Sequence, residues 1–247
     1  MLRTWDEFWG DVFLRQLPEL APDLERRRAE RAEWLWATLG LYPGARVLDL
    51  GCGNGMVGVC LARRGAHITG VDRLEPLLAR ARAAAGDLSA IFERADLRNV
   101  SFPEGSFDAI LLLEVLGLMS RADDASLLHR AAGWLAAGGR IMLDCPHPPG
   151  TASRTAEWDV SDGRVTLHTT FDRSTRLLHL EPTFHASDGT TIGLHDPYDP
   201  SRPDHSGVLR YLYPEEELRA MLEAAGLAGR RLPHPFSEGH FVLLGAA

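Results

Sequence analysis

The chain has 247 residues, of which 45% are hydrophobic and 24% charged, and its formal net charge is −8. This length accommodates one large α/β domain with a sizeable core, or two small ones. The negative charge argues against nucleic acid as a partner, because phosphate binding requires a basic face. All 26 basic residues are arginine, which excludes a lysine base or a Schiff base.

No apolar stretch is long enough for a membrane span. Residues 1–7 lack the apolar core of a signal peptide. We therefore expect a cytoplasmic protein with no membrane partner. The cysteines Cys52, Cys60 and Cys145 have no metal-ligand spacing, and they are expected to be small buried residues.

Two helices are predicted in the N-terminal region, 1–40. The first covers 5–17 and carries an aromatic face that includes Trp9, and the second covers 22–40. A helical lid over a binding site is one interpretation of residues 1–40. Simple packing against the body of the domain is the alternative.

The segment Val47–Gly55 reads Val-Leu-Asp-Leu-Gly-Cys-Gly-Asn-Gly and predicts a buried strand, a glycine turn and a helix over 55–64. Glycine permits unusual backbone angles and lets a ligand lie against main-chain N–H groups at a helix start. Asp49 favours a cationic ligand over a pyrophosphate. The spacing Gly53-x-Gly55-x-x-Gly58 also fits the dinucleotide fingerprint, so a nicotinamide cofactor is the alternative.

Further apolar runs predict a parallel sheet. The second strand ends at Asp72, about 20 residues after the glycines, where nucleotide-binding units hold a ribose. The third is followed by Asp96 and Leu97, and the fourth is apolar throughout, as interior parallel strands are. The expected strands cover 66–71, 90–95, 106–114 and 140–144, and a helix over 122–136 precedes the last of them.

The stretch 147–209 departs from a minimal α/β pattern. Short β-type runs at 164–171, 176–184 and 190–195 are separated by turn residues, including Asp188-Gly189. They predict a small antiparallel insertion that covers the substrate. An oligomer contact is the other role open to it.

The chain then returns to the α/β pattern. Pro214 and the glutamates after it predict the start of a helix that runs to 225. Two closing strands, 229–236 and 239–245, follow.

The chain closely resembles the class I, Rossmann-like, S-adenosylmethionine-dependent methyltransferases of the small-molecule type. Four features carry the resemblance, in this order: the glycine turn, the acids after the strands, the run Glu114-Val115-Leu116 and the passage into 140–144. The resemblance covers 44–146 and resumes at Arg210. It implies one α/β methyltransferase domain over 1–247, with a doubly wound, seven-stranded, mostly parallel sheet, an antiparallel closing strand and a β insertion after the fifth strand.

The resemblance also implies S-adenosyl-L-methionine as the cofactor. Asp72 would bind the ribose hydroxyls and Asp96 the adenine amine, with Leu97 against the ring and Glu114 facing the methyl group. The full set of expected cofactor-binding residues is Asp49, Gly51, Cys52, Gly53, Asn54, Gly55, Asp72, Arg73, Asp96, Leu97 and Glu114.

The predicted reaction is in-line methyl transfer to a nitrogen or oxygen of a bacterial metabolite or natural product. A base is needed only where the acceptor arrives protonated, and His147 and His195 are the candidates. Residues expected at the substrate are Trp9, His147, Tyr198 and Tyr211. No metal is expected, because Asp144 lacks the following partner of the magnesium-dependent catechol type. An NAD(P)-dependent oxidoreductase and a non-catalytic S-adenosylmethionine-binding protein are the alternatives.

Overall fold

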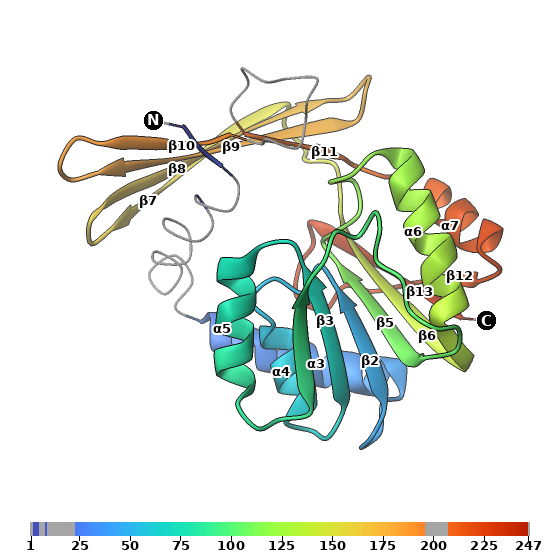
Figure 1. Ribbon diagram of the computed structural model, residues 1–247. Coiled ribbons are helices and arrows are strands. Elements are labelled where there is room, and N and C mark those ends of the chain that lie inside the picture. Colours follow the sequence, from blue (N-terminus) through green and yellow to red (C-terminus); the bar gives the residue numbers. More distant parts are fainter. Residues whose placement is uncertain (1, 5–7, 9–22, 196–206, 247) are drawn as a thin grey trace. The chain divides into compact units, whose positions relative to one another are not determined.

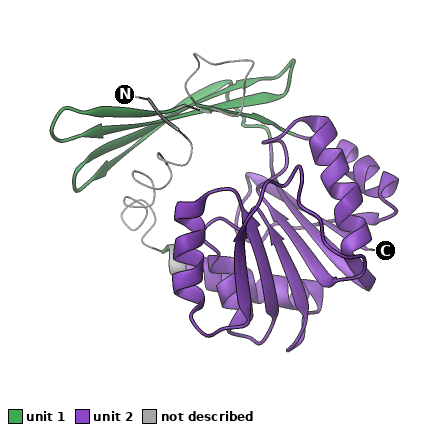
Figure 2. Ribbon diagram, viewed as in Figure 1, with its two compact units in different colours: residues 1–24, 148–212 green, residues 25–147, 213–247 purple. Residues whose placement is uncertain are grey.

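The computed structural model describes residues 2–4, 8, 23–195 and 207–246 (Figure 1). The chain divides into two compact units (Figure 2). One unit consists of residues 1–24 and 148–212, and the other of 25–147 and 213–247. The insertion expected over 147–209 thus falls, almost to the residue, in a unit that also includes the start of the chain.

The larger unit, 25–147 and 213–247, is built on a seven-stranded sheet with the order β12-β13-β6-β5-β2-β3-β4. β13 runs antiparallel to both of its neighbours, and the remaining pairs are parallel. The predicted mostly parallel sheet with an antiparallel closing strand is therefore confirmed. Its strands are β2 (Arg46–Leu50), β3 (His67–Asp72), β4 (Ala90–Arg94), β5 (Phe107–Leu113), β6 (Leu135–Pro146), β12 (Ala228–Leu232) and β13 (His240–Ala246).

Helices cover both faces of this sheet. Alternate strand residues such as Val47, Leu111 and Met142 share one core cluster with apolar residues of the first three helices. Their neighbours Leu48 and Leu112 are equally buried but lie outside that cluster, which is the pattern of strands covered on both faces. The helices are α3 (Leu24–Leu39), α4 (Met56–Ala62) and α5 (Glu75–Ala85) on one face, and α6 (Arg121–Trp134) and α7 (Glu215–Ala224) on the other (Figure 1).

The central strands and helices lie within a few residues of the predicted ranges, with two differences near the ends of elements. The helix predicted over 122–136 ends at Trp134, because Leu135 already pairs with Phe107 as the first residue of β6. The strand predicted over 229–236 ends at Leu232. None of the helices in the described residues has both the length and the hydropathy that a bilayer crossing requires.

The smaller unit, 1–24 and 148–212, contains a second sheet with the order β1-β10-β9-β8-β7, in which β11 also pairs with β9. All of these pairs are antiparallel except β1 with β10. Three of its strands match predicted β runs, whereas β1, β7 and β11 were not predicted. The strands are β1 (Leu2–Thr4), β7 (Ser153–Val160), β8 (Gly163–Asp172), β9 (Leu177–Ala186), β10 (Thr191–His195) and β11 (Val208–Tyr211).

An apolar core lies on this second sheet. It consists of Phe8, Val165, Phe184, Leu194 and Val208, all less than a tenth exposed. Apart from Phe8, the helix predicted over 5–17 lies outside the described residues. Its proposed role as a lid stays a prediction.

Gly55 gives a stability prediction, because it has a φ of 68° and a Cβ there would lie 2.5 Å from Cβ of Ala81 and 2.8 Å from the Phe92 ring. Gly55→Ala adds both backbone strain and overpacking, so it should lower the free energy of unfolding by about 2–4 kcal/mol. Gly133→Ala is the matched control, because nothing lies within 4 Å of the added Cβ. That change should leave stability unchanged or raise it by up to about 1 kcal/mol. Urea unfolding followed by tryptophan fluorescence measures both, and equal effects would contradict the packing argument.

Candidate functional site

The glycine turn between β2 and α4 holds its backbone in the left-handed region, with φ of 74° at Gly51, 55° at Gly53 and 68° at Gly55. The turn is fixed to β3, because the N–H groups of Gly51 and Cys52 donate to the Val71 carbonyl over 2.8 and 3.0 Å. At Gly53 the nearest atom to an added Cβ would be Cδ1 of Leu77, 4.0 Å away. The space beside Gly53 is therefore open, and a ligand placed there would meet bare main chain at a helix start.

Asp72, the last residue of β3, organises this turn. Its carboxylate accepts hydrogen bonds from the N–H of Gly53 over 2.8 Å and from the N–H of Leu74 over 2.9 Å. Burial raises the pKa of Asp72, and these backbone donors act in the opposite direction. The N–H of Arg73 is a further backbone donor to this carboxylate. Because a carboxylate has about four lone-pair positions, acceptor capacity remains for a hydroxyl of a ligand.

Asp49 is a buried acid in β2, only 3% exposed. Burial raises the pKa of Asp49 to about 7, while the positive charge of Arg31 opposes that rise and the negative charge of Asp72 adds to it. A cation bound near Asp49 would favour its ionised form and would in turn be stabilised by it.

Asp96 and Leu97 follow β4. Both carboxylate oxygens of Asp96 accept from Nε of Arg98 over 3.0 Å, and this pairing outweighs partial burial to lower the pKa of Asp96. The Leu97 carbonyl accepts from Nη2 of Arg130 over 2.7 Å. An adenine amine at Asp96 would therefore share the carboxylate with Arg98, whose side chain is 42% exposed.

The remaining predicted cofactor residues lie around the turn. Oδ1 of Asn54 accepts from Nη2 of Arg28 over 3.2 Å. Burial raises the pKa of the Cys52 thiol, so this cysteine is a small neutral residue and not a nucleophile. Arg73 is half-buried directly after Asp72. The structure thus brings Asp49, the turn and Asp72 together.

Glu114, at the end of β5, has a left-handed backbone with a φ of 63°, a conformation that is strained for a residue with a side chain and that clusters at functional sites. Its N–H donates to the Asp144 carbonyl over 2.9 Å. Its carboxylate lies 3.5 Å from Nη1 of Arg31 and its side chain is 48% exposed. Glu114 therefore presents a charge at the carboxyl edge of the sheet.

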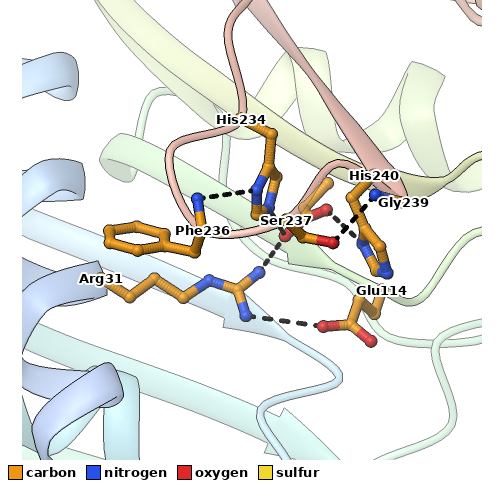
Figure 3. Close-up of polar contacts among 8 residues, drawn as sticks. Arg31, Glu114, His234, Phe236, Ser237, Gly239 and His240 are labelled. Carbon is orange, nitrogen blue, oxygen red and sulfur yellow. Dashed lines mark hydrogen bonds and ion pairs between the residues drawn. The ribbon is translucent and has the colours of Figure 1, made fainter.

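A second polar cluster, not predicted from the sequence, surrounds the buried carboxylate of Asp144 in β6 (Figure 3). Oδ1 of Asp144 lies 2.9 Å from Nδ1 of His240, at the start of β13. Oδ2 lies 3.3 Å from Nε2 of His234, in the loop before β13, and forms an ion pair with Arg31 of α3. We call these four residues the Asp144 cluster.

The Asp144 cluster holds its carboxylate ionised. Burial raises the pKa of Asp144, but the hydrogen bond from His240 and the positive charge of Arg31 more than offset it, so that the pKa lies below its ordinary value. Asp144 is only 2% exposed. A buried carboxylate is tolerated where such donors satisfy it.

Part of this cluster could have been predicted from the sequence. His234 and His240 flank the run Pro-Phe-Ser-Glu-Gly, and an antiparallel closing strand begins at the carboxyl edge of a parallel sheet. The fact that β13 pairs directly with β6, however, sets Val242 opposite Asp144 and His240 opposite Pro146, and that pairing is a property of the tertiary fold.

The predicted acceptor-side residues are dispersed. His147 follows β6, stacks on Phe241 with ring centroids 4.9 Å apart, and its Nε2 lies 3.4 Å from Nη2 of Arg231. Tyr211 and His195 end strands β11 and β10 of the smaller unit. Trp9 and Tyr198 lie outside the described residues. Their assignment to a substrate pocket stays a prediction.

Asp49 generates a pH prediction. Its pKa in the folded protein, about 7, exceeds the ordinary value of 3.8, so the folded state binds more protons than the unfolded chain between these values. The contribution of Asp49 to the free energy of unfolding therefore falls as the pH rises from about 4 to 7. Asp49→Asn should be more stable than the wild type at pH 8, by up to about 4 kcal/mol, and the gap should close towards pH 4.

Urea unfolding at several pH values measures this gap. The exposed residue Asp87 provides the control, because Asp87→Asn should show no pH-dependent difference. A gap for Asp49→Asn that stays constant with pH would contradict the raised pKa.

Known proteins resemble part of the larger unit in sequence. Residues 47–139 match a family described as "Methyltransferase domain". The ubiquinone biosynthesis O-methyltransferase of Aeromonas salmonicida is 33% identical over 116 residues, covering 46% of this chain and 48% of that protein. The 27-O-demethylrifamycin SV methyltransferase of Amycolatopsis mediterranei is 32% identical over 144 residues, covering 56% of this chain and 52% of that protein. The chain spans about half the length of the curated relatives it matches.

Solved structures share the fold over most of the chain. The CcbJ methyltransferase of Streptomyces caelestis superposes with a TM-score of 0.72 at 19% identity, covering 89% of both chains. CalS10, described as an amino pentose methyltransferase from Micromonospora echinaspora, superposes with a TM-score of 0.68 at 20% identity, covering 90% of both chains. At these identities the likeness shows the fold alone, which the chain shares with these two methyltransferases.

Proposed function

We propose that this chain, whose residues 47–139 form a methyltransferase domain, transfers a methyl group from S-adenosyl-L-methionine to a nitrogen or oxygen of a small molecule. One observation carries the proposal. The open space beside Gly53 lies in the family-matched segment, where the N–H of Gly53 donates to the carboxylate of Asp72 and the preceding strand carries the buried acid Asp49.

The residues of this site fit the cofactor chemically. The acids Asp49, Asp72 and Glu114 lie at or next to the ends of adjacent strands, and they favour a ligand that carries an ammonium and a sulfonium. A pyrophosphate would meet the same acids with repulsion, so they disfavour the dinucleotide alternative. Asp72 would hold the ribose hydroxyls with its remaining lone pairs, and Asp96 would accept from the adenine amine.

The sulfonium supplies the methyl group and needs no protonation to leave. The protein therefore has to align the acceptor and exclude water, and alignment alone contributes on the order of 7–11 kcal/mol. Glu114 and the Asp144 cluster lie along the carboxyl edge of the sheet, where open α/β sheets bind their ligands. A polar edge of this kind suits a hydroxyl or amine acceptor.

The relatives support a small acceptor. Their names refer to ubiquinone biosynthesis, a rifamycin and an amino pentose. The acidic chain, with a net charge of −8, supports the same class, because nucleic acid would require a basic face. We also propose that the protein is bacterial and cytoplasmic. For residues 148–212 we propose a role either as a cover over the substrate or as an oligomer contact.

Asp72 provides the first test of the cofactor site. Asp72→Ala removes the expected acceptor of the ribose hydroxyls and should weaken S-adenosylhomocysteine binding by about 1–3 kcal/mol, roughly 5–150-fold. Isothermal titration calorimetry measures the affinity. Asp87→Ala, at an exposed acid in the turn after α5, is the control and should bind as the wild type does. Unchanged affinity in a folded Asp72→Ala variant would refute the placement.

Turnover tests the reaction. The full chain, S-adenosyl-L-methionine and single acceptors (3,4-dihydroxybenzoate, 27-O-demethylrifamycin SV and glucosamine) should give acceptor-dependent S-adenosylhomocysteine and a product heavier by one methylene. Tight binding of a nicotinamide dinucleotide in place of S-adenosylhomocysteine would favour the oxidoreductase alternative. Cofactor binding without turnover of any acceptor would favour a non-catalytic binding protein.

A further inference from the structure

The Asp144 cluster contains an imidazole whose two nitrogens have different surroundings. Nδ1 of His240 lies 2.9 Å from Oδ1 of Asp144, and because the carboxylate can only accept, Nδ1 carries the proton. In the described part of the chain no hydrogen bond is recorded for Nε2 of His240, and the side chain is 22% exposed. A neutral His240 therefore presents the lone pair of Nε2.

His234 has the opposite arrangement. Its Nδ1 accepts from the N–H of Phe236 over 3.2 Å, and its Nε2 lies 3.3 Å from Oδ2 of Asp144. A nitrogen that accepts from an N–H has no proton, so the neutral ring carries its proton on Nε2 and donates to Asp144. His234, at 8% exposure, is thus a buried donor that fixes the carboxylate in place.

These tautomers decide between a base and a metal site. Asp144, His234 and His240 bring three ligand atoms within 4.8 Å of one another, a spacing that a metal ion would accept. A metal at Nε2 of His234 would, however, require that nitrogen to lose its proton while Nδ1 still faces the N–H of Phe236. Arg31 already places a positive charge on the same carboxylate oxygen. The geometry favours a hydrogen-bonded acid–imidazole pair.

The pair lies where an acceptor would meet the methyl group. The strand order reverses at β2, with β3 on one side and β5 on the other, and ligands of open α/β sheets bind at such a reversal, beyond the carboxyl ends of the strands. The next positions along that edge belong to β5, which is followed by Glu114, then to β6 with Asp144, and then to the start of β13 with His240. Adjacent strands are about 4.8 Å apart, so His240 lies roughly 10 Å along the edge from β5.

We infer that His240, oriented by Asp144, is the general base that takes the proton of the methyl acceptor. This inference rests on the proposed function. The acceptor oxygen or nitrogen forms its new bond to the methyl carbon while the carbon–sulfur bond breaks and its electron pair stays on sulfur, leaving neutral S-adenosylhomocysteine. The acceptor's proton moves to Nε2 of His240 and later to water. Asp144 stabilises the resulting imidazolium and stays ionised, with Arg31 and His234 as its further donors.

The other histidine at this edge is less suited to the role. Nε2 of His147 faces the guanidinium of Arg231 at 3.4 Å. Burial, together with the positive charge of Arg231, lowers the pKa of His147. The charged groups around His240 are Asp144 from β6, Arg31 from α3, Glu114 after β5, and His234 and His147 from the flanking loops.

His240→Asn is the decisive variant, because an asparagine amide takes the place of Nδ1, keeps a donor for Asp144 and removes the base. With the best acceptor of the panel above, kcat should fall about 10²–10⁴-fold, while the affinity for S-adenosylhomocysteine stays within twofold of the wild type. In the wild type, log kcat should fall with slope 1 at low pH as His240 protonates. This acidic limb of the pH profile should be absent from His240→Asn. His67→Asn, at the exposed start of β3, is the control and should keep kcat and the limb.

Asp144→Asn tests the positioning role. Loss of the carboxylate removes the stabilisation of the imidazolium, so the acidic limb should move to lower pH and kcat should fall. A merely structural effect would lower kcat without moving the limb. Long-range ¹H–¹⁵N spectra of the ¹⁵N-histidine-labelled full chain at pH 8, assigned with His240→Asn, should show the proton of His240 on Nδ1.

Each outcome decides between the proposals. A proton on Nε2 of His240, or turnover by His240→Asn at the wild-type rate with an unchanged pH profile, overturns the base and leaves methyl transfer standing. A wild-type protein that binds S-adenosylhomocysteine and methylates none of the acceptors overturns the proposed function, and the base with it.

Discussion

The arrangement of side chains at the carboxyl edge of the sheet depends on the guanidinium of Arg31. It forms ion pairs with Asp144 and Glu114 and acts electrostatically on the buried Asp49. Two of these acids are at most 3% exposed, and an isolated buried carboxylate is costly. Because Arg31 lies on α3, it ties the first helix of the larger unit to three strands of the sheet. Its loss would leave buried charge uncompensated.

This balance also explains the kind of ligand the edge prefers. Asp49, Asp72, Glu114 and Asp144 contribute four acids to the region, against the positive charges of Arg31 and Arg73. The surplus negative charge lies beside an open stretch of main chain at Gly53. A cationic cofactor therefore improves the electrostatics of the site, whereas an anionic one would worsen them.

The candidate site lies in one of the two compact units. The larger unit carries all of the contacts on which the cofactor site and the Asp144 cluster depend. The smaller unit, with its own apolar core around Phe184, is inserted between β6 and the segment that leads to α7. This insertion after β6 leaves the sheet intact, because β6 still pairs with β5 in parallel and with β13 over seven antiparallel residue pairs.

Local patterns in the sequence predicted much of the larger unit. The strand–turn–helix at Val47–Gly55, the acids at Asp72 and Asp96 and the apolar fourth strand each form a signal within a few residues, because strand burial and turn chemistry depend on near neighbours. The antiparallel hairpins around Asp188-Gly189 are local for the same reason. By contrast, β1 pairs with β10 across 191 residues of chain, and a strand of three residues has no pattern of its own.

The sequence by itself determined the parallel sheet, the glycine turn and the acids that border it, since these follow from hydrophobic periodicity and from backbone angles that glycine permits. It pointed to His147 and His195 as bases because each stands next to a strand or turn. Only the tertiary structure decided that His234, His240 and Arg31 converge on Asp144, from segments 90, 96 and 113 residues away. No local pattern encodes that convergence, because it arises from the antiparallel pairing of β13 with β6 and from the packing of α3 against the sheet.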